Sequence, residues 1–406
     1  MKYKLAQLAE IIDGDRGVNY PKQNEFQDEG YCLFLDAGNV TVNGFSFDSN
    51  QFITERKHHM LRKGVLEYDD IVYTTRGTIG NVAYYGNKTP YPHVRINSGM
   101  VILRTRQDIV NPLFLYHLLR HKNYRAYVTQ YSTGSAQPQL PIKTLSKISL
   151  DIPPLARQTK IASILSAYDN LIENNQKRIK LLEQMAQRLY QEWFVRFRFP
   201  GYETTKFVDG IPQGWEYGKI SSFYDTTAGG TPSRVHSKYY DEGTIPWIKT
   251  GEIKDSIILE TEEYITEEAI KYSAAKIMPR HSIIMAMYGV NIGYVGYLGK
   301  DMACNQAGCV FQEKNVQNSN HYLFQYLRAI REYLNGISFG AAQQNLSQKL
   351  IQRIKILMPD RAVLNLFNEK VDIIYHEIEL LLRQNQNLTK QRDPLLPRLM
   401  SGKLAV

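Results

Sequence analysis

Apolar residues recur at alternating spacings of three and four between residues 161 and 193, which indicates one long amphipathic helix. A repeat of seven residues is typical of a coiled-coil seam, so we expect this helix to pack against another helix. The seam positions are Ile161, Leu165, Tyr168, Ile172, Asn175, Ile179, Leu182, Ala186, Leu189 and Trp193.

The same pattern returns near the end of the chain. Its seam positions are Phe367, Val371, Ile374, Ile378, Leu381 and Leu388, with Asn385 as a polar interruption. Pro394 and Pro397 are expected to end this helix, because proline lacks a backbone N–H and clashes with the preceding turn.

About 150 residues precede each helix, and they are organised as short strands broken by Gly, Pro and Asn. Helical spacing returns only in short stretches, such as Pro112–Tyr124 and Asn320–Leu334. The pattern predicts a mixed α/β (α+β) domain before each long helix.

The two halves of the chain also resemble one another. Ser132–Leu140 matches Ser338–Leu346 at an offset of 206, and each match leads through an alternating strand to a proline. Farther upstream, Ile71–Val82 matches Ile283–Val295, and the order of the matches is preserved. Such self-similarity indicates a duplicated structural unit.

This duplication predicts four parts: a first domain at 1–153, a first helix at 154–198, a second domain at 199–359, and a second helix with a C-terminal tail at 360–406. Two copies related by a pseudo-two-fold axis have helices that run in opposite directions. We therefore expect an antiparallel helix pair that returns the C-terminus towards the first domain.

Composition narrows the class of protein. The chain is 43% hydrophobic and 22% charged, which is typical of a globular protein and argues against disorder. The longest uncharged run, 281–299, is rich in glycine, so we expect no membrane span. Three cysteines without paired spacing favour a reducing, cytoplasmic location over a disulfide framework. The net charge of +9 lies mostly in the first half and is a mild indication of a nucleic-acid partner.

Motifs for catalysis are weak. The chain has no phosphate-binding loop of the G-x-x-x-x-G-K-[ST] type and no G-x-G-x-x-G fingerprint. Asn111-Pro-Leu-Phe imitates a methyltransferase motif, but a helix cap with proline at the first helical position explains it.

Candidate metal ligands are equally weak. Asp241 with Glu252 and Lys254 loosely imitates a nuclease metal site, and the two latter residues are expected on one face of a strand. His117 and His121 have zinc-ligand spacing without further ligands nearby, and structural roles are expected for them and for Cys304 and Cys309. We predict no metal site.

Several segments resemble the DNA specificity subunits of type I restriction-modification systems. Ile152–Glu173 is similar to the family's proline-then-helix region, and Leu189–Phe194 and Leu396–Leu404 are similar to its helix ends. Ile211–Trp215 and Gly229–Ser233 also resemble the family, whereas Pro359-Asp-Arg departs from its frequent double proline and glutamine.

The resemblance implies a non-catalytic DNA-binding subunit that reads a bipartite, gapped target with one half-site for each domain. It implies docking to a pair of DNA methylation subunits and to restriction or translocation subunits where these are present. The assembled complex would be an adenine-specific methyltransferase and endonuclease. S-adenosylmethionine, ATP and magnesium are then expected in the partners, with no cofactor in this chain.

Loop residues able to contact phosphates or base edges of double-stranded DNA are the candidate site. They are Thr75, Arg76, Thr78, Ser135, Gln137 and Gln139 in the first copy, and Ser233, Arg234, Tyr288, Asn291, Gln343 and Asn345 in the second. Two alternatives stay open at this point: a self-contained DNA methyltransferase or nuclease, and a coiled-coil protein scaffold that does not bind DNA.

Overall fold

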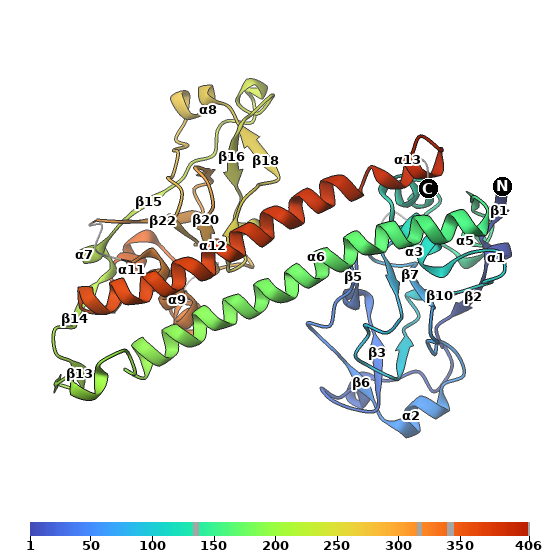
Figure 1. Ribbon diagram of the computed structural model, residues 1–406, viewed down its shortest axis with the longest axis horizontal. Helices are drawn as coiled ribbons and strands as arrows, with labels where there is room; N and C mark the ends of the chain where they lie inside the picture. The colour runs from blue at the N-terminus through green and yellow to red at the C-terminus, as the bar shows by residue number, and fades with distance from the viewer. Residues whose placement is uncertain (133–137, 315–318, 339–344, 405–406) are drawn as a thin grey trace. The chain divides into compact units, whose positions relative to one another are not determined.

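The computed structural model describes residues 1–132, 138–314, 319–338 and 345–404. The chain forms two compact units, each of which combines one globular domain with parts of both long helices (Figure 1). The first unit contains Met1–Ile172 and Asn387–Val406, and the second contains Glu173–Gln386. Within the described ranges, no helix has the length and apolar character needed to cross a membrane.

The globular part of the first unit contains short strands and short helices, as the sequence pattern predicts. The strands are β1 (Lys2–Lys4), β2 (Ala9–Asp13), β3 (Cys32–Leu35), β4 (Val40–Thr41), β5 (Gly44–Phe45), β6 (Phe52–Ile53), β7 (Ile71–Thr74), β8 (Val82–Tyr84), β9 (Val94–Ile96), β10 (Met100–Thr105) and β11 (Ser149–Asp151). The helices are α1 (Leu5–Leu8), α2 (Glu55–Met60), α3 (Pro112–Arg120), α4 (Lys122–Thr129) and α5 (Ile142–Leu145).

Two sheets carry this domain. Strands β2-β10-β7-β8 form an antiparallel sheet, and β6-β3-β9 form a smaller mixed sheet. Leu33 of β3, Val72 of β7 and Ile102 of β10 are fully buried in one cluster between the sheets. Burial of such branched apolar side chains from both sheets stabilises the domain.

The second unit has the corresponding elements. Its strands are β12 (Phe207–Val208), β13 (Ile211–Pro212), β14 (Glu216–Lys219), β15 (Tyr224–Ala228), β16 (Ile245–Ile248), β17 (Ser256–Ile258), β18 (Glu263–Ile265), β19 (Ile283–Ala286), β20 (Val295–Leu298), β21 (Ala303–Cys304), β22 (Gly308–Glu313) and β23 (Lys355–Met358). Its short helices are α7 (Ile220–Phe223), α8 (Glu267–Tyr272), α9 (Asn320–Ala329), α10 (Arg331–Ser338) and α11 (Gln348–Gln352).

The two domains share strand order and register, which confirms the duplication. Strands β15-β22-β19-β20 repeat the order β2-β10-β7-β8, and β18-β16-β21 repeat β6-β3-β9. Val101 pairs with Asp13 in the first domain, and its counterpart Cys309 pairs with Ala228 in the second. The second domain adds β17 parallel to β20, which extends its larger sheet to five strands.

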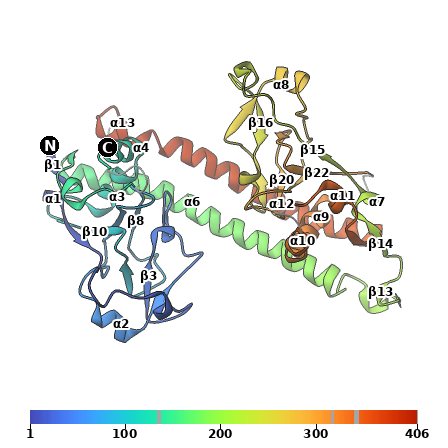
Figure 2. The ribbon, with the colours of Figure 1, turned by 180° about the vertical axis from the view of Figure 1, so that it is seen from behind.

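The long helices are α6 (Leu155–Tyr190), continued by a π-helical turn η3 (Gln191–Val195), and α12 (Arg361–Arg392), followed by α13 (Leu395–Met400). Within the second unit they run antiparallel, because Arg178 pairs with Glu377 and Phe194 packs on Phe367. Within the first unit, Asp169 pairs with Arg392 in the same antiparallel sense. Figure 2 shows both helices from behind.

The predicted seam lies inside the molecule. In the second unit, Ile179, Leu182, Leu189, Phe367, Val371, Ile374, Ile378 and Leu381 are buried in the core or pack against it. In the first unit, Ile161 and Leu165 join a core with Leu396 and Leu399 of α13. Tyr168, Ile172 and Leu388 are half-buried. The end of the chain therefore returns to the first domain, as expected.

Three details differ from the sequence prediction. The helix expected at 112–124 is two helices, because His121 adopts an extended conformation between α3 and α4. The helix expected at 320–334 is also two helices, but its break at Ile330 (φ −94°, ψ +13°) is not extended. Pro394 follows the end of α12 as expected, but Pro397 lies inside the short helix α13.

Candidate nucleic-acid interface

The loop between β7 and β8 presents candidate residues in the first unit. Gly77 has φ of +69° and open space around it, so the chain turns there without a side-chain clash. Arg76 is exposed and forms a β-bridge with Gln139, which is also exposed. Two residues far apart in the sequence are therefore held side by side. Thr78 is exposed on the same turn.

The loop between β19 and β20 has the same construction in the second unit. Gly289 has φ of +82°, and the exposed Tyr288 forms a β-bridge with the exposed Asn345. The Asn291 side-chain amide donates to the carbonyl oxygens of Gly251 and Ile253 at 3.2 and 3.1 Å. Asn291 thus ties its loop to the turn after β16.

An equivalent tie exists in the first unit, where the Asn81 amide donates to the carbonyl of Val40 at 2.8 Å. The two domains therefore hold the same loop in place with amides from different positions. The exposed pair differs: arginine and glutamine in the first unit, tyrosine and asparagine in the second. Arginine and amide side chains can form paired hydrogen bonds to base edges, and tyrosine can bind phosphate.

Arg234 and Ser233 lie on a second exposed loop of the second unit. The Arg234 guanidinium pairs with Glu263 at 2.6 Å and stacks over Tyr240 at 4.2 Å. The Trp247 indole N–H donates to the carbonyl of Gly230 at 3.0 Å and fixes the start of the loop. Arg234 is therefore held in one orientation although it is exposed.

The remaining candidates divide into two groups. Thr75 is buried, and its hydroxyl donates to the carbonyl of Gly99 at 3.0 Å, which explains it as part of the turn. Ser135, Gln137 and Gln343 lie outside the described residues. DNA contact stays a prediction for every residue of this set.

The candidate metal and thiol positions have structural explanations. His117 is buried with Nε2 3.0 Å from the Ser166 hydroxyl, and His121 faces the carbonyl of Asp393 at 3.2 Å. Burial raises the pKa of Cys304 to about 12, so its thiol stays protonated, and Cys309 is buried as well. Across the described part of the chain, no group of three or more His, Cys, Asp or Glu could hold a metal ion.

In the nuclease-like triplet of Asp241, Glu252 and Lys254, the last two residues do not lie on a strand. Glu252 ends a 3-10 turn, and its carboxylate accepts from the backbone N–H groups of Lys249 and Glu262 at 2.7 Å each. Lys254 follows this turn outside any strand. The expectation that both share one strand face is wrong, because the carboxylate caps a turn. The methyltransferase look-alike is explained as expected: Asn111 caps α3, with Pro112 as its first residue.

Sequence reasoning missed a second apolar stripe on the long helices. In the second unit, Leu181 and Met185 of α6 and Leu366, Ile373 and Leu380 of α12 are exposed. Leu366, Ile373 and Leu380 recur every seven residues outside the seam, a signal that was readable in the sequence.

Comparisons with known proteins agree with this architecture. Residues 1–184 and 212–363 match the family described as Type I restriction modification DNA specificity domain. The MjaIX specificity subunit of Methanocaldococcus jannaschii is 27% identical over 87% of this chain and 82% of the relative. The HindI specificity subunit of Haemophilus influenzae is 24% identical over 96% of this chain and 98% of the relative.

A crystal structure of the type I restriction-modification S subunit of M. genitalium shows the same fold. It aligns with a TM-score of 0.62 and 13% identity over 98% of this chain and 96% of that protein. The family match covers both duplicated domains, and the chain therefore belongs to the type I restriction-modification DNA specificity family.

Proposed function

We propose that this chain reads a bipartite, gapped DNA target, with one half-site for each domain. One observation supports the proposal: two domains whose shared strands have the same order and register present different side chains at the same bridged position. Arg76 with Gln139 in one domain and Tyr288 with Asn345 in the other offer different hydrogen-bonding groups. Recognition of two unrelated half-sites requires a common fold that presents different side chains from equivalent loops.

The proposal assigns partner docking to the exposed apolar stripe of the helices in the second unit. Ile373 is 73% exposed and Leu181 is 60% exposed, although both lie on helices whose opposite positions are buried. Exposed apolar side chains that repeat along one helix face, as Leu366, Ile373 and Leu380 do, are typical of protein interaction sites. The partners are a pair of methylation subunits and, where present, restriction or translocation subunits.

Catalysis and cofactors belong to those partners in this proposal. S-adenosylmethionine, ATP and magnesium would be bound by the methylation and restriction subunits, and this chain would supply recognition. The absence of phosphate-loop and dinucleotide motifs from the sequence supports this division.

Exchange of one domain tests the half-site assignment. Residues 1–153 are replaced by the corresponding domain of a relative, and methylated sites are mapped in cells that carry the methylation partner. One half-site should change while the other stays. The matched exchange of residues 199–359 should change the other half-site. Change of both half-sites, or of neither, in either exchange would contradict the proposal.

A second experiment tests docking. Ile373→Glu and Leu181→Glu place charges on the stripe and should weaken assembly with the methylation subunit at least tenfold, because burial of an unpaired charge is costly. Ile277→Glu, at a half-exposed isoleucine outside the helices, is the control and should assemble normally. Normal assembly of all three variants would show that this stripe is not the docking site.

The two other functions are separated by simple assays. A self-contained methyltransferase or nuclease would modify or cleave DNA as the purified chain alone. A scaffold without DNA binding would show no salt-sensitive DNA binding even with its partners present. We expect neither result.

A further inference from the structure

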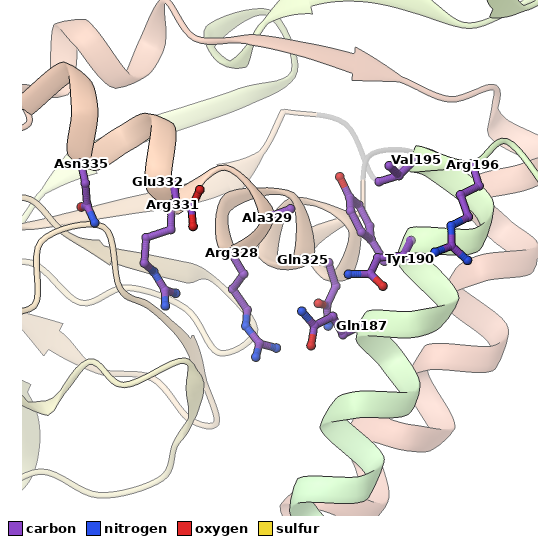
Figure 3. Close-up of a pocket in the computed structure, with 11 residues that line it drawn as sticks. Gln187, Tyr190, Val195, Arg196, Gln325, Arg328, Ala329, Arg331, Glu332 and Asn335 are labelled. Atoms are coloured by element: carbon purple, nitrogen blue, oxygen red, sulfur yellow. The ribbon is translucent and has the colours of Figure 1, made fainter. Parts of the chain in front are cut away.

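A pocket of about 650 Å³ lies in the second unit, between the end of α6 with η3 and the helices α9 and α10. Figure 3 shows the side chains of Arg328, Gln325 and Gln187 directed towards the space between α9 and α6. Gln325 is 1% exposed, so this part of the pocket is deep. None of the candidate DNA-binding residues that the structure describes lines this pocket.

Three polar atoms of this pocket are buried without a hydrogen-bond partner among the described residues: Arg328 Nη1, Gln325 Oε1 and Asn335 Oδ1. The Gln325 N–H is used, because it donates to the Tyr375 hydroxyl at 3.0 Å. Buried polar groups are nearly always paired, and an unpaired one is costly. The pocket thus offers a cationic donor and two acceptors to a ligand.

The first unit shows what the corresponding arginine binds. Arg120 of α3 occupies the position of Arg328, since each is the ninth residue after the cap of its helix, Asn111 or Ser319. Arg120 pairs with the Asp169 carboxylate at 2.7 Å and donates to the Tyr116 hydroxyl at 3.1 Å.

The partner of this arginine is missing in the second unit. At the repeat offset of 206, Tyr375 stands where the first unit has Asp169, and Ala186 stands where it has Arg392. Tyrosine has no carboxylate, and both Tyr375 and Ala186 are buried in the core of the second unit. Arg328 therefore has no counterpart of the Asp169 carboxylate, and it borders the pocket instead.

Among the described residues, no charged group near the pocket forms an ion pair with Arg328. Arg331 pairs with Asp255 at 2.5 Å, and Arg196 pairs with Glu192. Glu332 lines the pocket without forming an ion pair among the described residues. Burial raises the pKa of the Glu183 carboxyl, and Arg328 opposes this rise from beyond ion-pair distance.

We propose that this pocket binds an acidic side chain of a partner protein, with its Asp or Glu carboxylate on Arg328 and adjacent backbone N–H groups on Gln325 and Asn335. A protein segment carries an anion and N–H donors together. A DNA phosphate or an inorganic anion offers acceptors only and leaves both amide oxygens unpaired. The contact occurs once in the chain, because Asp169 occupies the equivalent site of the first unit, and it does not depend on the DNA target.

Capped peptides test the ligand class with the purified full chain. The probe is acetyl-Ala-Glu-Ala-amide, compared with its Gln counterpart and with free glutamate by calorimetry or NMR titration. We expect the Glu peptide to bind at least tenfold more tightly than the Gln peptide. Equal binding of the two peptides, absence of binding at millimolar concentrations, or binding of free glutamate alone would overturn the proposal.

Variants identify the site. Arg328→Met should abolish binding of the Glu peptide, whereas Arg383→Met, at an exposed arginine of α12 paired with Glu379, should bind normally. Gln187→Glu places a carboxylate in the pocket without changing side-chain size, and should raise the thermal midpoint and weaken peptide binding at least tenfold. Loss of binding in Arg383→Met, or unchanged binding in Gln187→Glu, would contradict the assignment.

Stability provides a readout without a peptide. Among the described residues, Arg328→Met removes no ion pair and only the contact of the guanidinium with the Phe324 ring at 5.5 Å, so it should change the thermal midpoint little. Arg120→Met breaks the pair with Asp169 and should lower the thermal midpoint by several degrees. Equal losses in the two variants would show that Arg328 already has an internal partner. These assays contain neither DNA nor a methylation subunit, so their failure leaves the domain-exchange result unaffected.

Discussion

The side-chain amide of Asn175 on α6 donates to Oδ1 of Asn385 on α12 at 2.9 Å, and its second N–H donates to Oε1 of Gln384 at 2.9 Å. Asn175 is buried, and its contact with Asn385 is a polar layer within a mostly apolar seam. A single polar position of this kind specifies register in coiled coils at some cost in stability. This amide contact therefore selects one antiparallel alignment of the two helices.

Asn175→Ala should lower the free energy of unfolding by about 1–2 kcal/mol, because two neutral hydrogen bonds are lost from a buried site. Chemical denaturation of the purified chain measures the change. Leu181→Ala on the exposed side of the same helix is the control and should change stability by less than about 0.5 kcal/mol. Equal effects of both variants would mean that the amide layer does not hold the helix pair.

His117 makes the stability of the first unit depend on pH. The pKa of His117 is lowered to about 4, chiefly by burial, with Asp169 opposing the shift and Arg120 and Arg392 adding to it. Between pH 6.5 and 4 the unfolded chain binds the extra proton, so stability falls as the pH is lowered through this window. At about 1.4 kcal/mol for each pH unit, the loss reaches about 3 kcal/mol.

His117→Gln should reduce this acid sensitivity, and glutamine suits the position because the second unit has Gln325 there. Unfolding free energies at pH 7 and pH 4.5 measure the difference. His376→Gln, at an exposed histidine of α12, should keep the acid sensitivity of the original chain. The same change in unfolding free energy between pH 7 and pH 4.5 in all three proteins would exclude His117 as the cause of the acid sensitivity.

Arg76 and Tyr288 are expected to contact DNA from equivalent loops. Arg76→Ala should weaken binding of the assembled complex by about 1–3 kcal/mol and relax specificity in one half-site only if the arginine contacts a base. If it contacts a phosphate, binding should weaken equally for all DNA sequences. The number of salt ions released on binding, obtained from the salt dependence of the affinity, should then fall by about one. Tyr288→Ala should affect the other half-site. Arg383→Ala serves as the control and should bind DNA normally. Normal DNA binding by both loop variants would show that these loops do not contact DNA.

The helices are expected to set the gap between the half-sites. Arg178 faces Glu377, so an insertion of seven residues after Lys180 is matched by one after Ile378, which keeps the seam in register. Each insertion lengthens a helix by about 10 Å, which corresponds to about three base pairs, and rotates the second half-site by about 100°.

Methylome mapping of this variant should show the same half-sites with a longer gap, or lost activity if the rotation is not absorbed. Modification at the original spacing would show that the helices do not set the gap between the half-sites. Insertion after Lys180 alone shifts the register of one helix against the other and should impair folding, which makes it the matched control.

The sequence by itself determined the elements that depend on periodicity. Seam residues such as Ile161 and Phe367 are buried because a seven-residue repeat places them on one helix face whatever the surroundings. The match of Ile71–Val82 to Ile283–Val295 predicted strands β7 and β19, which have the same partners in the two units. Local patterns and internal repeats were sufficient for this much of the fold.

Only the tertiary structure decided why residues of similar chemistry have different partners and different burial. Arg76 lies beside Gln139, and Thr75 is buried next to it, because strand pairing brings distant segments together and alternates side chains between faces. Arg120 and Arg328 occupy equivalent positions, yet among the described residues only Arg120 pairs with a carboxylate. The difference comes from the packed helices, where Asp169 and Arg392 in one unit correspond to Tyr375 and Ala186 in the other. A pairing between residues far apart in the sequence leaves no periodic signal, so it is decided only when the chain folds.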